Sequence, residues 1–413
     1  MGSVIGLSNR WNVLALLFLA RLSSPVHFMS LPPIAPELLT DLGIGYAELG
    51  WLLGLSSLPG VFLALPGGWL GQRLGDKPVV MASLALIASG SLLVAESPSF
   101  AVAVVGRLLG GIGIAVLHVQ VGRMVLDRFS PRETATAMAV TLSSWPLGIG
   151  LALALLGAVG EASSWRVAVG ITAAVPLAAL LAIGLAYRPV SRPVAAPRER
   201  ARHWTLSRAE LGLIASAGSA WMIWNAGFIV LVSFAPLLLV EQGSSLVAAG
   251  VVMSVPLWLS LVAIPLGGVL IDRTGRADLL IGTAIVGSAV VIALLPFGWA
   301  PALVLVVVLG IVRGPCAGGI NALPGEVLQP HNRSLGMGLY QTVYYVGMAV
   351  VPPLAGHLQG ATGSAATAIW FSAALTAAAL LPLWAFRWMQ RGWRPGHRKR
   401  PENSRGAALR KDE

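Results

Sequence analysis

The sequence predicts an all-α membrane protein with twelve transmembrane helices in two six-helix pseudo-repeats. Of its 413 residues, 56% are hydrophobic and 11% are charged, whereas soluble globular proteins carry about 25% charged residues. Twelve apolar runs follow one another, each close to the roughly 20 residues that cross a bilayer as a helix. A motif in the first six runs recurs 200 residues later, between Gly267 and Gly275 instead of Gly67 and Gly75. These observations exclude a soluble enzyme, a disordered protein and a single-anchor receptor.

The runs divide into two groups of six, with a polar, proline-interrupted segment between them. We therefore expect a first half over residues 1–187, a cytoplasmic linker over 188–208, a second half over 209–388 and a basic tail over 389–413. The first run has no small-residue cleavage site before its closing prolines, so we interpret it as a retained helix and not a signal peptide. The runs are Trp11–Leu31, Ala47–Pro66, Val79–Ala95, Phe100–Gly122, Ala135–Val159, Val167–Tyr187, Leu211–Val240, Val247–Ile271, Leu279–Leu295, Ala302–Leu323, Leu335–Gly356 and Ala365–Trp384.

Basic residues fall on alternate connecting segments. With the N-terminus in the cytoplasm, 24 of the 28 Lys and Arg residues lie in inside segments, and an outside loop holds only Arg166. This asymmetry follows the positive-inside rule and predicts a multi-pass protein of the plasma membrane (the inner membrane of a bacterial cell) with both termini cytoplasmic. It also accounts for the net charge of +11, so we expect the lipid bilayer and no nucleic acid as partner. The tail from Arg387 to Lys411 is expected to be a solvated anchor, with contact to anionic lipids as the alternative.

The repeated segments resemble a cytoplasmic signature of the major facilitator superfamily of secondary transporters, G-x-L-x-D-R-x-G-R-[RK]. The resemblance implies a loop that latches the two halves, since a carboxylate can pair with an arginine and a helix N-terminus. In the first half a glutamine stands where the signature has its acid, and Asp76 follows later, so we expect a weaker latch there. Within the superfamily, the chain is most similar to the cyanate-permease-like group of small-anion porters. The signature positions are Gly68, Gln72, Arg73 and Gly75 in the first half and Gly268, Asp272, Arg273 and Gly275 in the second.

Three arginines, Arg21, Arg107 and Arg313, lie deep in apolar runs, about 12–18 Å from the nearest run ends at 1.5 Å per helical residue. An intramembrane charge costs at least ~2.5–3.5 kcal/mol and is a functional-site hypothesis by default. No Asp or Glu lies at comparable depth in the sequence, so we expect a substrate to supply the negative charge. The alternatives are structural: backbone carbonyls as partners of Arg107, and helix packing for Arg313.

Other candidates surround these arginines. The resemblance implies that helices 1, 4, 7 and 10 line a central cavity, and helix 7 places four side chains on one face by their i, i+3, i+4, i+7 spacing. Such an aromatic stripe can equally be core or lipid-facing, and the two histidines proposed as proton carriers can equally be neutral core residues. The further substrate-binding candidates are Trp221, Trp224, Asn225, Tyr344 and Trp145; Phe228 completes the helix 7 face, Tyr340, Gln341 and Tyr345 are weaker candidates, and His27 and His118 are the proton-coupling candidates.

The sequence thus predicts a secondary active transporter that works by alternating access, with a small organic or inorganic anion as substrate. Coupling by proton symport or by anion exchange stays open. One alternative is a proton-coupled exporter of drugs or amphipathic compounds, and another is a non-transporting membrane sensor or scaffold. No nucleotide-binding loop, metal-ligand cluster or hydrolytic triad occurs in the sequence, so we expect no enzyme activity, cofactor or metal. The lone Cys316 allows no internal disulfide, and the resemblance implies a monomer.

Overall fold

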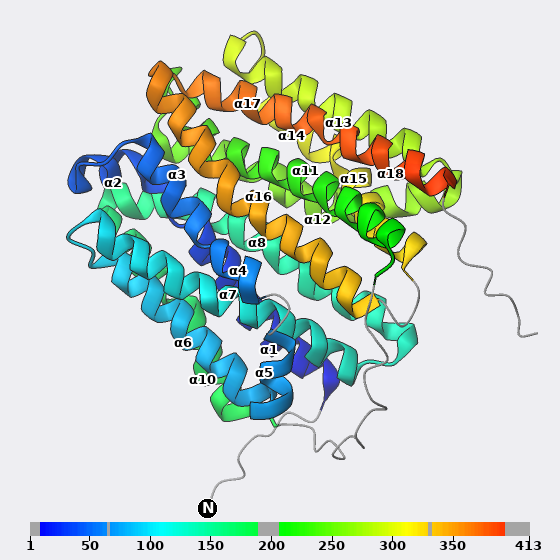
Figure 1. The fold of residues 1–413 in the computed structure, drawn as a ribbon. Coiled ribbons are helices and arrows are strands. Elements are labelled where there is room, and N and C mark those ends of the chain that lie inside the picture. The colour runs from blue at the N-terminus through cyan, green and yellow to red at the C-terminus, as the bar shows by residue number, and fades with distance from the viewer. Residues whose placement is uncertain (1–8, 64–66, 189–205, 329–332, 393–413) are drawn as a thin grey trace, which may run out of the picture.

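The computed structural model describes residues 9–63, 67–188, 206–328 and 333–392 (Figure 1). Within these residues every regular element is a helix, and most helices run alongside one another in one bundle (Figure 1). All twelve predicted apolar runs lie largely on helices, so the predicted all-α fold class is confirmed. The predicted linker lies mostly outside the described residues, as does nearly all of the basic tail.

The first half contains eleven described helical segments, which supply six passes through the bundle. Its second pass is divided because Pro59 has no N–H to continue the hydrogen-bond ladder of the preceding helix. The segments are α1 (Arg10–Phe28), η1 (Pro32–Ile34), α2 (Ala35–Leu42), α3 (Tyr46–Leu55), α4 (Leu58–Leu63), α5 (Gly67–Leu74), α6 (Asp76–Ala95), α7 (Phe100–Arg128), α8 (Pro131–Ala162), α9 (Trp165–Ile171) and α10 (Ala174–Ala186).

The second half contributes the other six passes. Its fourth pass is broken at Arg313, immediately before Gly314 and Pro315, a pair of residues that disfavours an unbroken helix. The segments are α11 (Arg208–Glu241), α12 (Leu246–Thr274), α13 (Ala277–Leu294), η2 (Leu295–Phe297), α14 (Ala302–Val312), α15 (Gly314–Val327), α16 (Arg333–Thr362), α17 (Ala365–Ala378) and α18 (Leu380–Gly392).

Nine spans among the described residues are long and apolar enough to cross a membrane, counting close helix pairs as one span. The count becomes ten when α1 and the bent segment Pro32–Leu42 are taken together, with an angle of 42° between them. The remaining two predicted runs lie on α3 and α4, which are short, and on α16, which contains Pro352 and Pro353. A multi-pass membrane protein follows from these lengths and compositions.

The internal repeat is visible in the backbone. Gly43 and Gly243 both have positive φ, 61° and 95°, and so do Gly75 and Gly275, 86° and 63°. A residue with a Cβ rarely adopts this conformation, so each glycine allows a sharp turn after a helix. The two pairs are separated by the same 200 positions, and the repeat therefore preserves turns as well as sequence.

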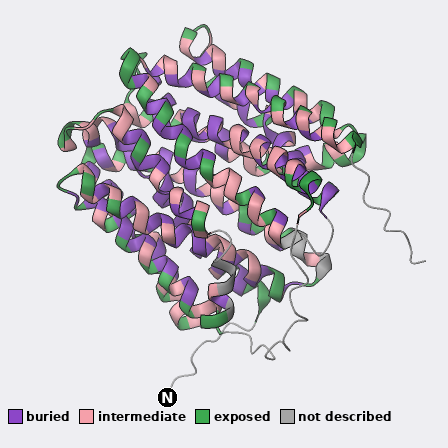
Figure 2. Cartoon of the chain, in the orientation of Figure 1, coloured by how far each residue is buried: buried purple, intermediate pink, exposed green. Residues whose placement is uncertain are grey.

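The two halves approach each other most closely through α3 against α16 and through α8 against α12. A Cβ added to Gly54 would lie 2.2 Å from the carbonyl oxygen of Ala349, and one added to Gly250 would lie 2.3 Å from that of Leu153. Glycines therefore let the backbones of the two halves touch. The helix α11 is buried along most of its length, as its colouring in Figure 2 shows.

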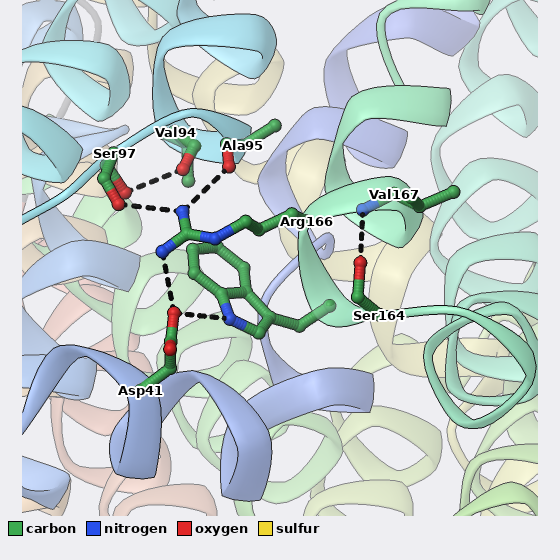
Figure 3. A network of polar contacts seen from close by, with 8 residues as sticks. Asp41, Val94, Ala95, Ser97, Ser164, Arg166 and Val167 are labelled. Atoms are coloured by element: carbon green, nitrogen blue, oxygen red, sulfur yellow. Dashed lines mark hydrogen bonds and ion pairs between the residues drawn. The ribbon is translucent and has the colours of Figure 1, made fainter.

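The end of the bundle opposite the chain termini carries a polar network around Arg166 (Figure 3). Its guanidinium donates to the carbonyl oxygens of Ala95 and Ser97 at 3.1 and 2.8 Å and pairs with Asp41 at 2.6 Å. The Trp165 indole N–H donates to the same carboxylate at 3.0 Å. This network ties α2, α6 and α9 together, and it gives the predicted outside arginine a packing role.

Candidate functional site

Arg107 on α7 is completely buried, with 0% of its surface exposed. Its Nε donates to the carbonyl oxygen of Leu52 at 2.8 Å, Nη1 to that of His27 at 2.6 Å and Nη2 to that of Phe28 at 2.9 Å. All three nitrogens are therefore engaged by backbone oxygens from α1 and α3. This geometry corresponds to the structural alternative for Arg107 and leaves little donor capacity for a substrate.

Arg21 on α1 has a different environment. Its side chain is half-buried, and its Nε finds no hydrogen-bond partner among the described residues. Arg21 lies within electrostatic range of Tyr344 and Tyr345 on α16 and of His118 on α7. Arg21 is thus an intramembrane cation whose neighbours are polar and uncharged, with donors left for a ligand.

His118 and Trp145 bring α7 and α8 to the same place. The His118 ring meets the Trp145 ring edge to face, with centroids 5.4 Å apart. Its Nδ1 lies 3.4 Å from the hydroxyl of Tyr345, and its Nε2 has no partner in the described chain. This hydroxyl contact crosses between the two halves, since His118 belongs to the first and Tyr345 to the second.

Aromatic rings continue from this contact into the second half. Tyr345 and Tyr344 have centroids 5.4 Å apart, Tyr344 and Trp221 6.3 Å, and Trp221 and Trp224 5.4 Å. Trp145, Trp221, Tyr344 and Tyr345 are half-buried, so part of each ring is open. We call the six residues His118, Trp145, Tyr345, Tyr344, Trp221 and Trp224 the aromatic row.

Arg313 closes the far end of the aromatic row. Its guanidinium carbon lies 3.9 Å from the ring centres of both Trp224 and Phe228, and the side chain is 6% exposed. The structure therefore places Arg21 and Arg313 at different points of one aromatic assembly.

Two other predicted residues have local partners. The Nδ1 of His27 lies 2.7 Å from the hydroxyl of Ser91, and the ring is 1% exposed against Gly110 of α7. The Asn225 amide donates to the carbonyl oxygen of Trp221 on its own helix at 2.8 Å. His27 therefore has the environment of a core histidine, and Asn225 keeps its amide oxygen for other contacts.

The repeated signature lies at the end of the bundle that carries the chain termini. The side chain of Gln72 and the surroundings of Gly68 lie outside the described residues, whereas Arg73, Asp272 and Arg273 are exposed. In the first half Asp76 forms an ion pair with Arg123 of α7. Asp76, the acid that follows the first-half signature, thus pairs with an arginine of α7. Gly75 and Gly275 lie at the turns after α5 and α12, and Gly268 lies on α12 itself.

A shallow hollow lies between α2 and the start of α9, at the end of the bundle opposite the signature turns. Its cation, Arg166, is already paired with Asp41, and Glu37 adds a further negative charge. Two carboxylates against one guanidinium give the hollow a net negative charge, which disfavours an anion there. The hollow is lined by Pro36, Glu37, Thr40, Asp41, Ser164, Trp165 and Arg166.

Tyr345, one of the weaker candidates from the sequence, contacts the first half of the protein at two places. A Cβ on Gly60 of the first half would lie 2.5 Å from the Tyr345 ring, so this ring packs directly on the backbone where α4 passes. Gly60 and Tyr345 are far apart in the sequence, and no pattern in a single sequence pairs them, so this contact could not be predicted.

Comparison with known proteins agrees with this architecture. The sequence model described as Major Facilitator Superfamily matches residues 17–235 and again 217–411. The 3-(3-hydroxy-phenyl)propionate transporter of Escherichia coli (strain K12) is 27% identical over 325 residues, which are 75% of this chain and 77% of that protein. The cyanate transport protein CynX of the same organism is 27% identical over 242 residues, 56% of this chain and 60% of that protein.

Solved structures support the same fold. A bacterial homologue of the human lysosomal transporter Spinster, in an inward-facing and occupied conformation, superposes with a TM-score of 0.74 at 16% identity. The match covers 96% of this chain and 100% of that one. The nucleoside transporter NupG gives a TM-score of 0.70 at 16% identity, covering 91% and 99%. A family model that matches both halves, together with this fold, shows that the chain belongs to the Major Facilitator Superfamily and is a multi-pass membrane transporter.

Proposed function

We propose that the protein is a secondary transporter of small organic anions, and that Arg21 is the residue that binds the anionic group. The observation that carries the proposal is the half-buried Arg21, whose Nε is buried and has no hydrogen-bond partner among the described residues. A charge at this depth is retained at a cost of at least ~2.5–3.5 kcal/mol. A negatively charged substrate offsets that cost while it is bound.

The surroundings of Arg21 favour an organic anion over an inorganic one. Tyr344 lies within electrostatic range of Arg21, Trp221 packs against Tyr344 and Trp145 against His118, all as half-buried aromatic side chains. Such rings bind planar apolar groups by stacking and burial. Arg107, whose nitrogens donate to backbone oxygens, is left out of the substrate set. The names of two relatives, an aromatic propionate transporter and a hexuronate transporter, describe proteins that carry carboxylates.

His118 is the proposed coupling residue, because it lies within electrostatic range of Arg21 and contacts the Tyr345 hydroxyl of the opposite half. A proton on this ring and an anion on Arg21 would interact favourably, so the two could move together. His27 is a weaker candidate, since its ring packs against α7 and its Nδ1 already pairs with Ser91.

The test is ligand-dependent thermal stability of the detergent-purified protein, followed by uptake into proteoliposomes. The panel contains 3-phenylpropionate, glucuronate and cyanate, with 3-phenylpropan-1-ol as the uncharged analogue. We expect the organic anions to raise the unfolding midpoint by mass action and Arg21→Gln to weaken their binding about tenfold or more, the loss of a charged hydrogen bond. Arg276→Gln is the matched control, because Arg276 is exposed at the turn after α12.

An equal midpoint shift with the alcohol, or unchanged anion binding in Arg21→Gln, would refute the anion proposal. The first result would favour the second candidate, an exporter of amphipathic compounds that uses the aromatic row. One observation favours that candidate: a putative multidrug resistance protein MdtD of Pectobacterium atrosepticum is 38% identical over 109 residues, 26% of this chain and 23% of that protein. Raised tolerance of expressing cells to toxic hydrophobic compounds is its readout.

A further inference from the structure

Arg313 is one of the three deep arginines, and the groups around its guanidinium differ from those around Arg21 and Arg107. Its guanidinium lies against the rings of Trp224 and Phe228, 3.9 Å from both ring centres. Aromatic rings stabilise the faces of a cation by their quadrupole but accept no hydrogen bonds in the guanidinium plane. The Nη1 atom is buried and has no hydrogen-bond partner within the described chain.

Arg107 provides the internal comparison. It is as deeply buried, and its Nε, Nη1 and Nη2 each donate to a carbonyl oxygen at 2.6–2.9 Å. The fold can therefore satisfy an intramembrane arginine with its own backbone. The Nη1 of Arg313 has no such backbone partner among the described residues, although the helix is broken at this residue.

A second unpartnered donor lies next to Arg313. The indole Nε1 of Trp224 is buried without a hydrogen-bond partner in the described residues, and the tryptophan is 4% exposed. The guanidinium contacts the ring that carries this nitrogen. Two buried N–H groups, one of them cationic, are thus available together and neither meets a protein acceptor, which is costly unless something else accepts.

We propose that Arg313 and Trp224 form a second anion-accepting point, located in the second half and separate from Arg21. It takes one small anionic group, which accepts from Arg313 Nη1 and from the Trp224 indole. Tyr344 and Trp221 lie between this second point and Arg21 along the aromatic row. This inference rests on the proposed function where the anionic group is the far end of the substrate, and is independent of it where the group is a free halide.

The first arm of the test uses bromide as the probe. The unfolding midpoint of the purified protein is followed against bromide, with sulfate keeping the ionic strength constant. We expect a saturable rise in wild type and in Arg21→Gln, and a flat response in Arg313→Gln. Trp224→Phe keeps the ring stacking and removes the indole N–H, so it should weaken bromide about tenfold and serves where Arg313→Gln does not fold.

The second arm uses rigid planar ligands in matched pairs. Terephthalate is compared with benzoate, and naphthalene-2,6-dicarboxylate with 2-naphthoate, so that each pair differs by one far carboxylate. We expect wild type to bind one dicarboxylate at least about tenfold more tightly than its partner. This preference should vanish in Arg313→Gln, in which each dicarboxylate should bind no more tightly than its monocarboxylate partner.

The outcomes separate the two proposals. A bromide response that depends on Arg313 identifies a free small anion, and a dicarboxylate preference that depends on Arg313 identifies the substrate's far end; either result supports the second point. Identical bromide responses and identical ligand ratios in wild type and in both the Arg313→Gln and Trp224→Phe variants overturn it. Benzoate binding that persists in Arg21→Gln and also in the double variant Arg21→Gln/Arg313→Gln contradicts the proposed function and leaves the bromide arm as the test of Arg313.

Discussion

A methyl group at Gly54 should push α3 and α16, and with them the two halves, apart near the middle of α16. The added Cβ of Gly54→Ala would lie 2.2 Å from the Ala349 carbonyl oxygen, and ordinary contact begins at 3.4 Å. Relief therefore needs a displacement of about 1.2 Å between α3 and α16. Overpacking of this kind costs ~1–3 kcal/mol, which corresponds to a change of about 5- to 150-fold in the ratio of closed to open molecules.

The second half offers a control with the same local geometry. A Cβ at Gly314 would also lie 2.2 Å from a carbonyl oxygen, that of Ala263, but both residues belong to one half. Gly314→Ala should therefore lower thermal stability without separating the halves. The two substitutions impose the same clash and differ in whether a rigid-body movement of one half against the other can relieve it.

The assay is the distance between spin labels on exposed residues of the two halves, at Thr40→Cys and Ala361→Cys, in a background with Cys316 replaced by Ser. Wild type should give one short distance, and Gly54→Ala a second, longer population. Gly314→Ala should keep the wild-type distribution. If the two variants gave the same distance distribution, the close approach of α3 and α16 would be ordinary packing and not a closure between the halves.

Other predictions address single contacts. Arg107→Gln should sharply lower the unfolding midpoint with or without ligand, since three backbone acceptors lose a charged donor, each worth ~1.5–3 kcal/mol; a stable variant that merely loses anion binding would contradict the structural role. His118→Gln should abolish uptake driven by a pH gradient while keeping substrate counterflow, and retained pH-driven uptake would remove His118 from coupling. Asp76→Asn should destabilise the protein by loss of its Arg123 ion pair, whereas Asp272→Asn at the exposed matching turn should change the midpoint much less.

The architecture was accessible from sequence because it depends on features that are local. Run length, basic-residue placement and turn glycines are each properties of short segments, and the pair Gly75 and Gly275 marks the same turn in both halves. The break at Arg313 was not predicted, although Gly314 and Pro315 carry its signal. In an apolar run, continuity of hydrophobicity concealed the local preference of these two residues.

Sequence patterns grouped the candidate site residues and left their roles open. Helical spacing places Trp221 and Trp224 on one face, and the structure stacks them with centroids 5.4 Å apart. The partners of Arg107 come from the end of α1 and from α3, and no sequence pattern connects those carbonyls to an arginine 55 or more positions away. Assignment of a role requires knowing which acceptors lie within reach, and that is a property of the packed bundle.

The three deep arginines show why depth alone does not identify a substrate contact. They are the same residue type in the same apolar setting, so the cost of burying the charge is similar at each. What differs is the group that surrounds each guanidinium. Backbone oxygens accept hydrogen bonds from Arg107, aromatic rings lie against Arg313, and Arg21 has uncharged neighbours among the described residues. Donor capacity left over after the fold has been satisfied is what a ligand can use. By that criterion Arg107 is satisfied within the first half, whereas Arg21 and Arg313 each keep a buried donor without a partner among the described residues, which is why both are proposed as anion contacts.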